Sequence, residues 1–164
     1  MHALDSLHRM LISHTELYLL AIKSATVVLL CYVAFTDLRT FKIENKSVFV
    51  LFVLYVLYVV VARTRHEVMA DIFVGVAVFG FLLWVYTTGA VGGGDVKLLP
   101  VVCLWVGAHC AALFSILLLV LIGLHLIVVR LGWTSARSIN GRLAIPYAPS
   151  VTGAMLGAVL LGCV

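Results

Sequence analysis

Two aspartates, Asp37 and Asp95, stand at the edges of strongly apolar segments and are the side chains best suited to chemistry. A carboxylate inside a bilayer costs roughly 2.5–3.5 kcal/mol at a helix centre, so an acid beside such a segment is a functional candidate. Two neighbouring carboxylates cannot both ionise easily, so such a pair holds one shared proton. The charged member can then activate a water molecule while the protonated member polarises a peptide carbonyl.

A run of three glycines directly precedes the second aspartate: Gly92, Gly93 and Gly94. Adjacent glycines open backbone conformations that other residues avoid, and they allow another chain to approach closely. We therefore expect this run to hold an extended peptide beside Asp95. Lys97 and Arg39 are candidate substrate-binding cations, with anchoring at the membrane interface as the alternative role for each.

The composition indicates an integral membrane protein. Of the 164 residues, 64% are hydrophobic and 11% are charged, whereas soluble domains carry about 25% charged residues. A helix satisfies its own backbone hydrogen bonds in lipid, so we expect an all-α bundle of about six transmembrane helices. The chain is expected to form a single domain over residues 1–164, with a polar, amphipathic or disordered lead at 1–16. Contact with membrane lipid follows, and no basic run with interleaved aromatics supports binding of nucleic acid.

Apolar segments predict where the helices lie. The apolar run at 98–129 holds 32 residues, which is about 48 Å of helix against about 30 Å of hydrocarbon. We expect a break at Gly107-Ala108-His109, which leaves a short first helix over about 96–107. Gly153 and Gly157 predict close packing of the last helix on a neighbour. The other spans are expected at 17–36, 47–62, 68–88 and 146–164.

The distribution of cations predicts the orientation. If the run at 98–129 is broken into two helices, one side of the membrane holds seven cations and the other holds three. If it is a single helix, the two sides hold four and six. Cytoplasmic loops carry the excess of lysine and arginine, so we expect six spans in the inner membrane, both aspartates cytoplasmic and both termini outside. The seven are Arg39, Lys42, Lys46, Lys97, Arg130, Arg137 and Arg142, against Arg9, Arg63 and Arg65.

Four cysteines lie in apolar segments and form no Cys-x-x-Cys pair: Cys31, Cys103, Cys110 and Cys163. Small apolar core residues are the expected role for all four. We expect no metal site and no cofactor, because clustered ligands at short spacing are missing. Asp71 is expected in the first turn of its helix, where an acid complements the helix dipole.

Three motifs in order resemble those of the type IV prepilin peptidases, a family of membrane aspartic proteases. They are Asp37-x-Arg39 with Ile43-x-Asn45, Gly92-x-Gly94-Asp95 with Lys97-Leu98, and Pro146-Tyr147-Ala148-Pro149. Glu44 stands where the family usually has proline, and Ala148 where it often has glycine. Neither departure removes a candidate catalytic group.

The resemblance implies an aspartic endopeptidase with Asp37 and Asp95 as the catalytic residues, and it leaves open which one is the base. Its substrate would be a type IV or Flp-type prepilin, or a pseudopilin, with a basic leader and an apolar helix. Cleavage would follow a leader glycine at the cytoplasmic membrane face. Longer members carry an N-terminal extension with paired Cys-x-x-Cys motifs and methylate the new N-terminus. This chain resembles the short members that process Flp/Tad pilins, so no N-methyltransferase activity is expected.

Two other functions remain open from the residues alone. A small proton- or ion-coupled transporter could use the same aspartates. A non-enzymatic scaffold of a secretion machine would need neither of them. A further reading is structural: Asp37 would be an interfacial acid paired with Arg39, and the glycine run a flexible turn.

Overall fold

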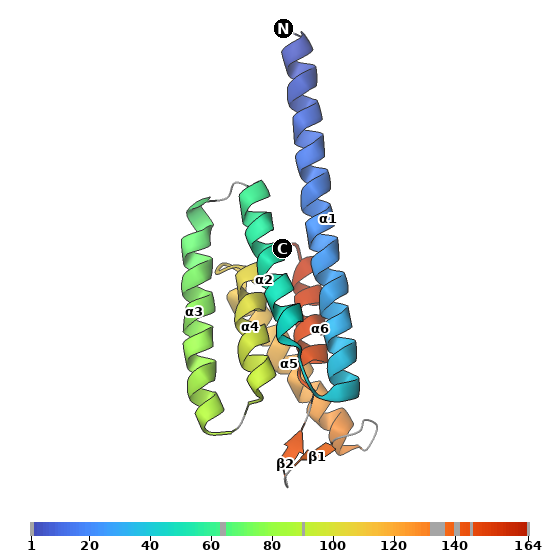
Figure 1. The fold of residues 1–164 in the computed structure, drawn as a ribbon, viewed down its shortest axis with the longest axis vertical. Helices are drawn as coiled ribbons and strands as arrows, with labels where there is room; N and C mark the ends of the chain where they lie inside the picture. Colours follow the sequence, from blue (N-terminus) through green and yellow to red (C-terminus); the bar gives the residue numbers. More distant parts are fainter. Residues whose placement is uncertain are drawn as a thin grey trace.

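The computed structural model describes residues 2–62, 65–89, 91–131, 137–139, 142–144 and 146–163. Within these ranges the chain forms six helices and one short antiparallel hairpin (Figure 1). The elements are α1 (His2–Thr40), α2 (Asn45–Ala62), α3 (Arg65–Thr87), α4 (Gly93–Val106), α5 (Ala111–Arg130), β1 (Arg137–Ile139), β2 (Arg142–Ala144) and α6 (Ala148–Leu160). The prediction of an all-α membrane bundle with about six helices is confirmed.

The first helix is longer than its apolar span. α1 runs without a break through the lead, so the backbone of residues 2–16 is helical and is not a separate segment. Its membrane-spanning part is His14–Thr40. Figure 1 shows its N-terminal end extending well beyond the other helices. At its other end Phe41 takes a left-handed conformation (φ 54°), which turns the chain sharply into α2.

Four long helices enclose two short ones. The spans His14–Thr40, Asn45–Ala62, Val68–Thr87 and Ala111–Arg130 are long and apolar enough to cross a membrane. α4 and α6 have 14 and 13 residues, about 20 Å each, which is less than the hydrocarbon thickness. They are also the most buried helices, and Figure 1 shows them in the middle of the bundle. Neither of these inner helices is therefore long enough to cross a full bilayer by itself.

The break in the long apolar run is confirmed. α4 ends at Val106, and Gly107 follows with φ 77°, a conformation that glycine adopts at helix ends at little cost. α5 then begins at Ala111, so this stretch folds back as a helical hairpin. Splitting relieves the mismatch between helix length and bilayer thickness.

Close contacts between helices hold the core together. The indole N–H of Trp105 donates to the carbonyl of Leu51 at 3.1 Å, and the Thr152 hydroxyl donates to the carbonyl of Leu30 at 3.1 Å. Added methyl groups at Gly153 and Gly157 would lie 3.0 and 3.1 Å from leucine side chains of α5. The predicted close packing of α6 through its glycines is therefore confirmed.

The expected role of the cysteines is wrong for three of them. Cys110 and Cys163 form a disulfide, with their Cα atoms 5.9 Å apart, and Cys31 is exposed on α1. Only Cys103 is a buried core residue. The bond forms because the α4–α5 turn and the end of α6 reach the same end of the bundle, a proximity that spacing along the chain does not reveal.

The expected position of Asp71 is also wrong. α3 begins at Arg65, so Asp71 lies beyond its first turn. Its carboxylate accepts a hydrogen bond from the Ala108 N–H at 2.8 Å and one from the Tyr55 hydroxyl at 3.4 Å. Asp71 thus fastens α3 to the α4–α5 turn and to α2.

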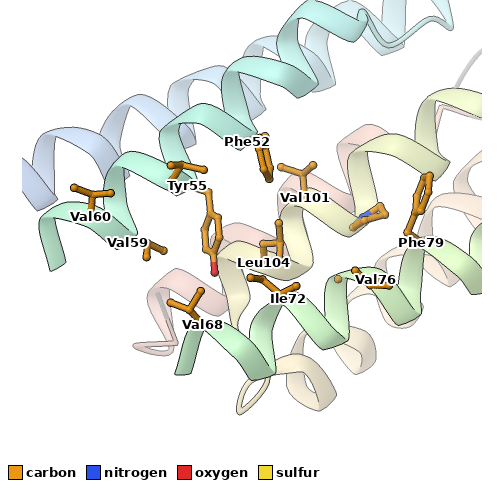
Figure 2. A pocket seen from close by; sticks show the side chains of 13 residues that line it. Phe52, Tyr55, Val59, Val60, Val68, Ile72, Val76, Phe79, Val101 and Leu104 are labelled. Carbon is orange, nitrogen blue, oxygen red and sulfur yellow. The ribbon is translucent and has the colours of Figure 1, made fainter. Parts of the chain in front are cut away.

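An apolar groove of about 540 Å³ lies between α2 and α3 (Figure 2). Phe52 and Val60 of α2 face Val68 and Phe79 of α3 across it, and Leu104 of α4 lies at its base. Several of these side chains are exposed in the isolated molecule, so they face membrane hydrocarbon. Neither candidate catalytic aspartate lines this groove.

Candidate functional site

The structure brings Asp37 and Asp95 to the same end of the bundle. Asp37 lies in the last turn of α1 and Asp95 in the first turn of α4. Both are buried, with 5% and 8% of their surface exposed. The charge of Asp37 acts electrostatically on Asp95, so the two carboxylates are neighbours although two spans separate them in sequence.

Asp37 is held by the N-terminus of α6. The Ala148 N–H donates to its Oδ2 at 3.1 Å, and Ala148 is completely buried. This N–H belongs to the first residue of the helix and has no partner within it, and a helix N-terminus favours a negative charge. The substitution of alanine for the family's glycine at 148 therefore leaves the donor in place, because the backbone makes the bond.

Asp95 sits at the N-terminus of its own helix. It is the third residue of α4, and its carboxylate accepts a hydrogen bond from the backbone of Gly92, the N-cap residue. The Asp95 N–H donates in turn to the Gly92 carbonyl at 3.1 Å. Two helix N-termini thus converge on the site, and each supports one carboxylate.

The glycine run serves close packing rather than unusual backbone geometry. Gly93 and Gly94 form the first turn of α4, and none of the three glycines has a positive φ. A methyl group at Gly94 would lie 3.0 Å from the Ile43 side chain, and one at Gly92 would lie 3.1 Å from Asp95 Oδ2. The expectation that this run adopts backbone conformations closed to other residues is therefore wrong. Gly94 does permit a close approach, but the group that approaches it is the Ile43 side chain of the same chain.

The two predicted substrate-binding cations have partners within the chain. Lys97 Nζ donates to Asn45 Oδ1 at 3.0 Å, which joins the start of α4 to the start of α2. The Arg39 guanidinium lies 4.2 Å from the ring centre of Phe35. In the part of the chain that the structure describes, neither cation forms an ion pair with Asp37 or Asp95, so the suggested Asp37–Arg39 pair is absent there.

Two further side chains interact electrostatically with the aspartates. Burial, followed by the negative charge of Asp95, raises the pKa of the Tyr147 hydroxyl, so this group stays protonated beside the site. His125 of α5 acts electrostatically on Asp37. Sequence reasoning passed over His125 because it carries no fixed charge. Its signal in the sequence is a single imidazole near the Arg130 end of an otherwise apolar span.

Within the described ranges, no group of three or more histidine, cysteine, aspartate or glutamate side chains is arranged to hold a metal ion. The groups at the site are two carboxylates, two helix N-termini, a phenol and an imidazole. This set can share protons and polarise a carbonyl group.

A sequence model of the type IV leader peptidase family matches residues 24–129, which is more than half of the chain. The chain belongs to the type IV leader peptidase family. The match contains both Asp37 and Asp95, and it confirms the resemblance that the motifs indicated. No curated protein and no solved structure matches the chain. As a type IV leader peptidase, the protein is a membrane peptidase with a prepilin as its general class of substrate.

Proposed function

We propose that this protein is an aspartic endopeptidase that removes the basic leader from a type IV or Flp-type prepilin, using Asp37 and Asp95. The observation that carries this proposal is the meeting of two buried carboxylates at one end of the bundle, each at a helix N-terminus. Family membership favours it over a transporter that would use the same acids.

The pair would start the reaction with one proton between them. The charged carboxylate removes a proton from water, whose oxygen attacks the scissile carbonyl carbon, while the protonated carboxylate gives its proton to the carbonyl oxygen. The resulting diol collapses as a proton passes to the leaving nitrogen and the C–N bond breaks. A hydroxyl proton of the diol returns to the pair, which again holds one proton.

The substrate must present an unwound peptide bond at this site, because a helical segment has its carbonyl groups already hydrogen-bonded. The aspartates lie at one end of the bundle, where α1 ends and α4 begins, and this position suits cleavage just before an apolar helix. The leader would lie in the aqueous phase and the apolar helix in the lipid.

We place the aspartates on the cytoplasmic side of the inner membrane, with both termini outside. The disulfide supports this placement, because it lies at the opposite end of α4 and α6 and disulfides persist in oxidising compartments. The broken apolar run supports it as well, because the split restores seven cations against three under the positive-inside rule.

Replacing each aspartate with asparagine tests the proposal. Asp37→Asn and Asp95→Asn should each reduce cleavage of a co-purified prepilin by at least about a thousandfold, because the pair can no longer both hold and accept a proton. Mass analysis of the released leader gives the rate. Normal cleavage by either variant, with normal accumulation in the membrane, would refute the pair.

Asp71→Asn is the matched control. Its amide oxygen can still accept the hydrogen bond from Ala108, and the residue lies at the other end of α4. We expect cleavage within about twofold of the unmodified protein. Loss of activity in this variant, with normal folding, would require a different assignment of the acids.

A further inference from the structure

Lys23 lies on the buried face of α1, the face that also carries Asp37. Thr26, Leu30, Val33 and Asp37 follow Lys23 at the spacing that aligns one side of a helix, and each of these four is at most 5% exposed. Lys23 is half-buried and continues this face toward the opposite end of the bundle, about 21 Å from Asp37. A cation on the inner face of a membrane helix is costly unless a partner compensates it, so Lys23 is a candidate for a functional site.

The Lys23 side chain lines a polar cavity of about 270 Å³, which we call the Lys23 cavity. Asp71, His109 and Cys163 line it as well, together with residues of α2 and α4. It therefore lies where the two short helices α4 and α6 end, beside the disulfide and at the other end of the bundle from Asp37 and Asp95. The proposed cleavage reaction makes no use of this cavity.

One cation and one carboxylate line the Lys23 cavity without pairing with each other. The Lys23 ammonium lies 5.6 Å from the ring centre of Tyr58, and Asp71 accepts hydrogen bonds from the Ala108 N–H and the Tyr55 hydroxyl. Among the residues that the structure describes, no ion pair joins Lys23 to Asp71. An ionised carboxylate has about four acceptor positions, so Asp71 can still accept further hydrogen bonds. A ligand that carries both charges would compensate both side chains.

Apolar grooves adjoin the Lys23 cavity on two sides. A groove of about 490 Å³ along α1 and α6 shares Lys23 and Trp105 with it. The groove between α2 and α3 shares four lining residues with it: Tyr55, Val59, Val68 and Leu104 (Figure 2). A polar cavity between two apolar grooves is complementary to a molecule with one polar head and two apolar chains.

We propose that the Lys23 cavity binds the headgroup of a zwitterionic phospholipid with a primary ammonium, its phosphodiester against Lys23 and its ammonium toward Asp71. The acyl chains lie in the two adjoining grooves. Charge complementarity carries this choice, because a head with a phosphate alone leaves Asp71 without a cation, and an uncharged head leaves Lys23 without an anion. A primary ammonium donates hydrogen bonds to a carboxylate, whereas a trimethylated one has no N–H to donate. This inference does not rest on the proposed function.

Native mass spectrometry of the whole protein in detergent tests the site. The probes are dioleoyl phosphatidylethanolamine, phosphatidylglycerol and phosphatidylcholine, which share their chains and their phosphodiester and differ only in the rest of the head. We expect a single phosphatidylethanolamine to stay bound to each protein, at least about tenfold more tightly than either other lipid, because only its head donates charge-assisted hydrogen bonds to Asp71.

Variants of Lys23 test the phosphodiester contact. Lys23→Met removes the charge and keeps the length of the side chain, so affinity for phosphatidylethanolamine should fall about tenfold or more. Lys23→Arg keeps the charge and should retain most of the affinity. Lys46→Met is the matched control, because it removes an exposed lysine at the aspartate end of α2 and should bind lipid as the unmodified protein does.

Two results would overturn the proposal. Equally tight binding of phosphatidylglycerol or phosphatidylcholine would show that the ammonium is not recognised, and unchanged binding by Lys23→Met would place the lipid elsewhere on the protein. If Lys23→Met accumulates poorly, Lys23→Gln replaces it in the same measurement. Cleavage by Asp37→Asn and Asp95→Asn is measured separately, so failure of the lipid site and failure of the proposed function are distinguishable.

Discussion

Gly94 and Ile43 belong to different sequence motifs and are in contact in the structure. A residue without a side chain at position 94 leaves the space that the Ile43 side chain fills. The Ile43 side chain fills the space where a Cβ atom of residue 94 would stand, which seats the α1–α2 loop on the first turn of α4. The next motif residue, Asn45, accepts the hydrogen bond from Lys97. At the residue scale, these two contacts join the segments that carry the two aspartates.

Gly94→Ala should weaken this junction. The added methyl group would lie 3.0 Å from Ile43, so the loop must shift, and overpacking of this kind costs about 1–3 kcal/mol. We expect cleavage to fall roughly five- to hundredfold, measured as kcat/KM on a prepilin.

Gly93→Ala is the control for that change, because both glycines lie in the first turn of α4 and gain the same helix propensity. Its methyl group would make an ordinary contact with the Tyr86 ring at 3.6 Å, so activity should stay near normal. Combining Gly94→Ala with Ile43→Ala should recover part of the lost activity. Equal losses in the two single variants would contradict the packing explanation.

At the scale of elements, the N-terminus of α6 is the part of the fold that fixes Asp37. Ala148→Pro removes the N–H that reaches Oδ2, at a helix position where proline is well tolerated. A hydrogen bond to a charged group contributes about 1.5–3 kcal/mol, so cleavage should fall roughly ten- to hundredfold. The pH profile of kcat/KM should also move upward on its acidic side.

Ala148→Gly keeps the N–H and restores the residue that the family often has there. It should cleave at close to the unmodified rate, with circular dichroism showing equal helix content in both variants. Full activity of Ala148→Pro would show that α6 does not hold Asp37 in this way.

At the scale of the whole molecule, the disulfide closes the end of the bundle away from the aspartates. Joining residues 53 apart restricts the unfolded chain, and a loop of this size is worth about 2–4 kcal/mol. The Cys110→Ser/Cys163→Ser double variant should therefore melt several degrees lower in detergent, whereas Cys31→Ser should not. Equal melting temperatures would argue against the bond.

The same bond reports the orientation of the protein. In intact cells, a membrane-impermeant reductant followed by an impermeant maleimide should label Cys110 or Cys163. A cysteine placed at Lys97 should be labelled only after the cells are opened. Labelling of position 97 in intact cells would reverse the proposed topology.

Much of this molecule was predictable from local properties of the chain. Hydropathy and the length of a bilayer span located the helices, and the excess length of the run at 98–129 required the break at Gly107. Two predicted spans separate Asp37 from Asp95, so the chain crosses the membrane twice between them and both residues were expected on the same side. These conclusions depend only on how each segment meets a slab of hydrocarbon, so they need no knowledge of which helices are neighbours.

Other features depend on which helices pack together and on how each is rotated. The bond from Ala148 to Asp37 joins residues 111 apart, and the disulfide joins residues 53 apart. The contact of Ile43 with Gly94 is of the same kind. Hydropathy does not encode these contacts, because every face of a helix in lipid is apolar and the pattern does not show which face is buried. Only the tertiary structure decided them, by packing two short helices at the centre of four long ones.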